Sequence, residues 1–101
     1  ENTRFRLAEC AAALQSAQLT VDHCLLRRIE GNLDDSVAAA GRMVAAAAHD
    51  RVVDCGLQLH GGYGYMKEYP IAQAFADARQ LRQWERTYGE ARDSIAHAIG
   101  L

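Results

Sequence analysis

Proline, long apolar runs and paired metal ligands are almost missing from this sequence, and each absence excludes a class of protein. The 101 residues contain one proline, Pro70, together with many alanines, a composition that favours helices. No apolar run approaches the roughly 18 residues of a membrane span, and the first residues lack the apolar core of a signal peptide. We therefore expect a helical, cytoplasmic protein.

The cysteines and histidines do not form a recognisable metal or redox motif. Cys10, Cys24 and Cys55 lack the close spacing of such motifs. If Cys10 and Cys24 share one straight helix, roughly 21 Å separates them, which is beyond disulfide reach. None of the four histidines has a partner four residues away, so a zinc site is not expected. The thiols are expected to be reduced, buried, small apolar side chains.

Length and charge limit the remaining possibilities. A chain of this length forms one domain. A hydrophobic fraction of 50% with 24% charged residues is typical of a globular protein with a real core. The formal net charge of -2 gives no reason to expect nucleic-acid binding, which depends on clustered cations.

Two long helices are predicted in the first half of the chain. An apolar stripe with steps of three and four residues predicts a helix over 5–30, which Gly31 and Asn32 end. The stripe consists of Leu7, Ala11, Leu14, Gln18, Val21 and Leu25. A second helix, capped by Asp34, Asp35 or Ser36, is expected to reach about Leu59. Its alanine clusters, 38–40 and 45–48, favour close packing of a neighbouring helix or subunit over mere helix propensity.

Two shorter helices are predicted after the glycine-rich stretch. Pro70 suits the first turn of a helix over 71–83. The apolar period is interrupted over 84–89, and a last helix is expected from about Glu90. Short connections between these helices predict an all-α fold, an antiparallel four-helix bundle over residues 1–101. The first stripe begins with no cap before it, which indicates that an upstream part is missing.

The stretch from Gln58 to Pro70 holds three glycines and three tyrosines. Glycine permits a positive φ, so Gly61 and Gly62 can end a helix and expose its amides. The tyrosines add amphipathic rings beside this turn. From the residues alone, a ligand-facing loop and a plain change of direction are both open.

Several uncommon elements at fixed spacing resemble the C-terminal domain of the acyl-CoA dehydrogenases. They are Gln58, Gly61-Gly62, Gly64-Tyr65, Glu68-Tyr69-Pro70 and Asp77-Ala78-Arg79. These tetrameric flavoenzymes oxidise acyl-CoA thioesters to trans-2-enoyl-CoA and pass electrons to an acceptor. The resemblance covers most of the chain and implies the C-terminal part of a longer flavoenzyme. It also implies an acyl-CoA substrate, a homo-oligomer (a dimer of dimers) or a related subunit as partner, and no catalysis by the isolated chain.

The resemblance also implies an FAD contact. In the family, the matching segment contacts the adenine end of FAD bound mainly by a neighbouring subunit, and a matching threonine contacts its pyrophosphate region. The residues at these positions are Gln58, Leu59, His60, Gly61, Gly62 and Thr87.

Glu85 is the candidate catalytic base. Its residue type and position alone favour a solvated glutamate paired with Arg82 or Arg86. The resemblance aligns 84–87 with the family's Tyr-Glu-Gly-Thr, whose glutamate removes the α-proton in many members. Arg86 stands at the family's glycine position, and Gly89 replaces a polar residue that touches the cofactor. An ion pair with Arg86 would lower the pKa of the carboxyl and weaken it as a base.

Two rival functions remain. A non-catalytic structural subunit can keep the fold and complete a partner's FAD site. A DNA-binding flavoprotein of the same fold is the other rival. The negative net charge of the chain disfavours it, because DNA binding needs clustered cations. Lys67 and Arg79 do not belong to a cluster that would form an anion site.

Overall fold

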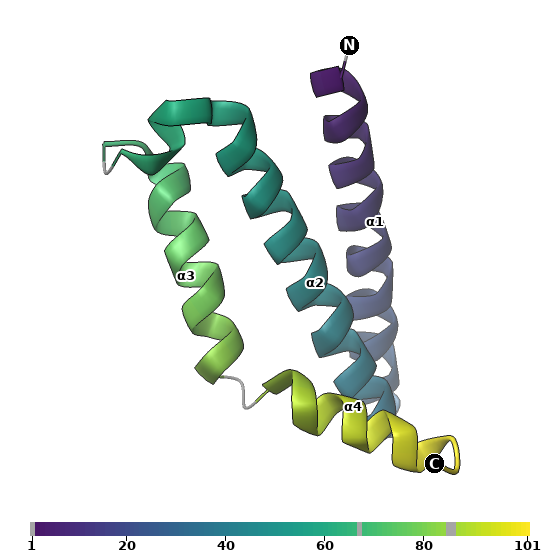
Figure 1. The fold of residues 1–101 in the computed structure, drawn as a ribbon. Helices are drawn as coiled ribbons and strands as arrows, with labels where there is room; N and C mark the ends of the chain where they lie inside the picture. Colours follow the sequence, from purple (N-terminus) through teal and green to yellow (C-terminus); the bar gives the residue numbers. More distant parts are fainter. Residues whose placement is uncertain (1, 67, 85–86) are drawn as a thin grey trace.

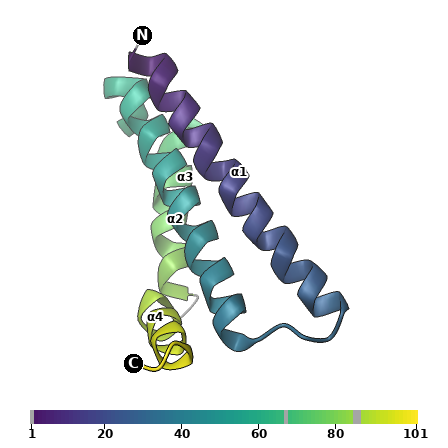
Figure 2. The ribbon, with the colours of Figure 1, turned by 90° about the vertical axis from the view of Figure 1, so that its right-hand side faces the viewer.

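In the part of the chain that the structure describes, four α-helices and one short 3₁₀ helix make up the fold. The two long helices, α1 (Asn2–Ile29) and α2 (Asp35–His60), run antiparallel. The 3₁₀ helix η1 (Gly61–Tyr65) turns the chain into α3 (Pro70–Trp84), which runs back beside α2 (Figure 1). The last helix, α4 (Thr87–Ala98), runs across the foot of α2 and α3 and is seen nearly along its axis in Figure 2. The all-α, four-helix prediction is confirmed.

The computed structural model describes the backbone of residues 2–66, 68–84 and 87–101, and their side chains except those of 63, 65, 81–84, 87 and 88. In these ranges α2 is the central helix, because α1, η1, α3 and α4 all pack against it. Within the same ranges, no helix combines the length and the apolar composition of a bilayer span.

The core is built mostly from small side chains. Its buried residues are Cys10, Ala17, Ala39, Ala48, Val53, Leu57, Ala78 and Ala91. Gly41 is also buried, and a Cβ built on it would lie 2.8 Å from Sγ of Cys24 on α1. The prediction that the small residues of α2 let a neighbouring helix approach closely is therefore confirmed at α1.

The helices begin and end close to the residues that the sequence predicts, with two corrections. Gly31 has φ +78° and ends α1, and the Asn32 amide donates to the Arg27 carbonyl. Asp34 is the N-cap of α2, but its side chain makes no capping hydrogen bond, so the predicted role of its carboxylate is wrong. Its backbone carbonyl accepts the first intrahelical hydrogen bond, from the Ala38 amide. The fourth helix begins at Thr87, not Glu90, because an interrupted apolar period does not interrupt backbone hydrogen bonding.

The apolar stripe that predicts α1 faces α2 only in part, because Val21 and Leu25 line a second pocket with residues of α2. Leu7, Leu14 and Leu25 remain 53%, 49% and 53% exposed, whereas Cys10 and Ala17 occupy the buried face. Figure 2 shows the outer side of α1 with no other helix against it. The most apolar face of α1 is thus left largely uncovered by this chain.

Candidate functional site

The end of α2 forms a sharp corner at Gly61. This residue has φ +61° and ψ −137°, and its amide donates to the carbonyl oxygen of Gln58. L-residues with a side chain rarely adopt such a φ, which explains the glycine at this position. The predicted helix stop is confirmed, but the Gly61 amide is engaged within the chain and is not free for a ligand.

Gly61 and Gly62 face open space. Both are exposed, and a Cβ built on either would meet no atom within 4 Å. Gly64 is the opposite case, because it is buried and a Cβ on it would lie 2.7 Å from the carbonyl oxygen of Leu57. The contact of Gly64 with α2 folds η1 back onto the helix and leaves the Gly61–Gly62 backbone accessible from outside.

The last turn of α2 adds three partly exposed side chains to this corner. Gln58 and His60 are exposed, and Leu59 is 36% exposed. Nδ1 of His60 lies 2.7 Å from the carbonyl oxygen of Gly56. Because a carbonyl can only accept, Nδ1 carries the hydrogen, and Nε2 is the nitrogen left for other contacts. The His60 ring also meets Tyr69 edge-on, with ring centroids 6.2 Å apart.

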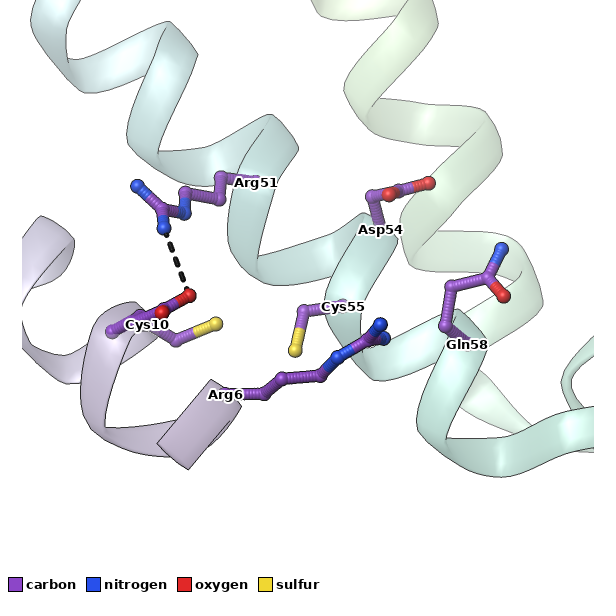
Figure 3. Close-up of a pocket in the computed structure, with 7 residues that line it drawn as sticks. Arg6, Cys10, Arg51, Asp54, Cys55 and Gln58 are labelled. Carbon is purple, nitrogen blue, oxygen red and sulfur yellow. Dashed lines mark hydrogen bonds and ion pairs between the residues drawn. The ribbon is translucent and has the colours of Figure 1, made fainter. Parts of the chain in front are cut away.

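Gln58 also lines a pocket of about 310 Å³ between α1 and α2 (Figure 3). The lining residues are Arg6, Glu9, Cys10, Arg51, Asp54, Cys55 and Gln58. Nη2 of Arg51 lies 3.2 Å from Oε2 of Glu9, an exposed ion pair that contributes about 0 to 1 kcal/mol of stability. The pocket is therefore polar at its rim and carries two thiols at its wall.

The two thiols line the same pocket, and Cys55 affects the pKa of Cys10. A hydrogen bond with the Cys55 thiol, followed by burial, raises the pKa of Cys10. All three cysteines are free, as predicted. Only Cys10 is fully buried, so the expectation of buried side chains is wrong for Cys24 and Cys55, which are half-buried.

The structure does not bring all predicted site residues together. Gln58, Leu59, His60, Gly61 and Gly62 gather at one end of α3, whereas α4 begins with Thr87 at the other end (Figure 1). The 15 residues of α3 separate these ends by roughly 22 Å. Glu85 lies outside the described residues, as does the side chain of Thr87.

Sequence reasoning missed the pocket between α1 and α2. Of its lining residues, only Gln58 was a predicted site residue. The others come from two helices whose relative register no local pattern encodes. Within the described residues, no group of three or more His, Cys, Asp and Glu side chains could hold a metal ion.

The chain matches the family model for the acyl-CoA dehydrogenase C-terminal domain over residues 1–100. The long-chain specific mitochondrial acyl-CoA dehydrogenase of Rattus norvegicus is 37% identical over 99 residues, which cover 98% of this chain and 23% of that protein. The enzyme of the same name from Sus scrofa is 38% identical over 100 residues, with coverage of 98% and 23%.

A relative that is named for a different activity is also similar. The 3-(aryl)acrylate reductase of Clostridium sporogenes is 33% identical over 84 residues, which cover 83% of this chain and 22% of that protein. The chain thus spans less than a quarter of the length of each of these three relatives.

Proposed function

Since this chain belongs to the acyl-CoA dehydrogenase family, as its C-terminal domain, we propose that it completes an FAD site in a longer flavoenzyme. That enzyme would oxidise an acyl-CoA thioester to the 2-enoyl-CoA. The observation that carries the proposal is the open Gly61–Gly62 corner beside exposed Gln58. Because the chain spans less than a quarter of its relatives, most of the flavin and substrate site would lie in other parts of the protein.

The residues at this corner fit the edge of a dinucleotide. The Gln58 amide offers both a donor and an acceptor, and the bare Gly61 and Gly62 backbone allows close approach. Leu59 offers a partly exposed apolar edge, and His60 offers Nε2. When bound, FAD supplies the acceptor for the β-hydrogen, which leaves as hydride.

Glu85 is proposed as the base that removes the α-proton of the thioester. Support comes from its alignment with the family's Tyr-Glu-Gly-Thr, not from geometry. A carboxylate acts as a base at neutral pH when partial desolvation raises its pKa, and it must stand within hydrogen-bond reach of the α-carbon. Thr87, at the start of α4, is the proposed contact to the cofactor's pyrophosphate region.

An oligomer is proposed because one chain leaves both its surface and its site incomplete. The outer face of α1 exposes several leucines, and the two groups of site residues lie at opposite ends of α3. A homo-oligomer (a dimer of dimers) or a related subunit would cover that face. The electron acceptor and a cytoplasmic location remain predictions.

Gly62→Leu in the complete protein tests the FAD contact. A bulky side chain in the open corner should displace the cofactor and weaken FAD binding at least about tenfold, a loss of about 1.4 kcal/mol, which lowers the flavin bound per chain. Gln80→Leu, an exposed position on α3, is the matched control and should leave flavin content unchanged. Flavin absorbance relative to protein absorbance measures both. Full flavin content in Gly62→Leu would contradict the contact.

Glu85→Gln separates catalysis from the structural alternative. A glutamine keeps the shape but cannot take a proton, so turnover of an acyl-CoA should fall by at least about a hundredfold while flavin is retained. The measurement is reduction of an artificial electron acceptor together with flavin content. Unchanged turnover would favour the non-catalytic subunit that only completes a partner's FAD site.

A further inference from the structure

We propose that Cys10 and Cys55 form a reversible dithiol–disulfide pair, and that a low-molecular-mass disulfide oxidant joins α1 to α2 through them. Both sulfurs point into the space between the two helices in Figure 3, and both line the same pocket. This inference does not depend on the flavin site.

Proximity of the two thiols is the first requirement of a disulfide, and Cys10 and Cys55 line one pocket with both sulfurs directed into it. The pKa of the Cys10 thiol is raised, chiefly by Cys55, which agrees with this placement. Cys10 lies on the buried face of α1, where it is 7% exposed, and Cys55 lies half-buried on α2. Because α1 and α2 pack directly together, the two cysteines lie on facing helices.

Access for an oxidant is the second requirement. The pocket of about 310 Å³ has space beside both thiols, and its lining carries balanced charge from Arg6, Arg51, Glu9 and Asp54. Oxidised glutathione is a low-molecular-mass disulfide that can serve as the oxidant. Cys55 is the more exposed thiol of the pair, so we expect it to react first.

Cys24 has a different environment. Its thiol donates to the Val37 carbonyl oxygen at 3.6 Å, and it packs against Gly41. It is absent from the lining of the pocket that Cys10 and Cys55 share. The chain therefore contains its own control for thiol reactivity.

The chemistry proceeds in two exchange steps. The Cys55 thiolate attacks one sulfur of oxidised glutathione, so a mixed disulfide forms and one glutathione thiolate leaves. The Cys10 thiolate then attacks the Cys55 sulfur and releases the second glutathione thiolate. The protein loses two protons and two electrons, and the oxidant is reduced to two glutathione thiols.

The second step should depend on pH. Cys10 is the attacking group, and its raised pKa keeps it protonated at neutral pH. The groups around it act in opposite directions: Cys55 and Glu9 raise its pKa, whereas Arg51 lowers it, and Arg6 and Asp54 also line the pocket. The mixed disulfide should therefore accumulate at neutral pH and convert to the internal disulfide increasingly fast as the pH is raised.

Mass spectrometry of the complete protein after incubation with oxidised glutathione tests the pair. We expect tryptic peptides 7–27 and 52–67 to become joined, with loss of two hydrogen atoms and reversal by a reducing thiol. Because peptide 7–27 contains both Cys10 and Cys24, the test is run on Cys24→Ser, whose hydroxyl can still donate to Val37. Joined peptides in this variant assign the bond to Cys10 and Cys55.

Two further variants check the assignment. Cys10→Ser should stop at the glutathione adduct on Cys55, and Cys55→Ser should give no joined peptides. The oxidised protein should melt roughly 5 °C or more above the reduced protein, since the bond closes a long loop across the α1–α2 turn. Peptides 7–27 and 52–67 that stay unjoined at pH 9, or a bond that uses Cys24, would overturn the proposal.

Discussion

At the residue scale, three glycines near the end of α2 meet three different physical conditions. Gly61 has a positive φ, Gly62 faces open space, and Gly64 packs against the Leu57 carbonyl. A methyl group added at each position therefore tests strain, exposure and close packing separately. The same chemical change should have three different outcomes.

We expect the stability of the alanine variants to fall in a fixed order. Gly64→Ala should be the most destabilising, by about 1 to 3 kcal/mol, because its Cβ would lie 2.7 Å from a backbone oxygen. Gly61→Ala should cost about 1 to 2 kcal/mol, because φ +61° with ψ −137° is a backbone conformation that is nearly restricted to glycine. Gly62→Ala should lie within about 0.5 kcal/mol of the wild-type protein.

Urea unfolding of the three variants measures these differences in the free energy of unfolding. Gly62→Ala serves as the control, because it adds the same methyl group without strain or contact. A Gly62→Ala variant less stable than Gly64→Ala would contradict the packing of η1 on α2.

These positions also show what the sequence can predict about a site. The helix stop at Gly61 was predictable because a doubled glycine after a helical stripe has a local cause. The close packing of Gly64 on Leu57 was not, since it depends on how η1 folds back. The placement of Cys10 and Cys55 at one pocket was equally hidden, because it depends on the register between α1 and α2.

At the scale of elements, the small residues of α2 explain its central position. A helix that packs against four other elements needs short side chains on several faces. Ala39 is 0% exposed and Ala48 is buried, whereas Ala47 faces solvent. Alanines on one helix thus differ greatly in the space around them.

Ala39→Leu should destabilise the fold, and Ala47→Leu should not. Three extra carbons at a fully buried position force neighbours apart, at a cost of about 1 to 3 kcal/mol. At the exposed position the change should stay within about 0.5 kcal/mol. Thermal unfolding of both variants measures the difference, and equal melting temperatures would refute close packing around Ala39.

The boundaries of the helices were more predictable than which face of each helix is buried. Periodicity, Gly31 and Pro70 predicted where α1, α2 and α3 begin and end to within a few residues. The α1 stripe nevertheless turned out to be exposed, and Cys10 and Ala17 were the buried positions. A pattern identifies an apolar face, but it does not tell whether the same chain or another one covers that face.

At the scale of the whole molecule, the outer side of α1 is an apolar surface that the rest of this chain leaves exposed. Its exposed large apolar residues are Phe5, Leu7, Leu14, Leu19, Leu25, Leu26 and Ile29. Exposed apolar residues spread along a whole helix are unusual for a chain that stands alone. They support the proposed oligomer, in which another copy or subunit covers α1.

Replacing Leu7, Leu14 and Leu25 with glutamine should weaken subunit association without unfolding the chain. Each leucine is already about half exposed, so burying the remainder contributes about 1 kcal/mol to association. The triple variant should therefore associate about a hundredfold more weakly. Sedimentation measures the mass of the complete protein, and circular dichroism reports its helicity. Ile99→Gln, which is 69% exposed beyond the end of α4, is the control and should keep the wild-type mass. If the triple variant keeps the wild-type mass at all concentrations, α1 is not the subunit interface.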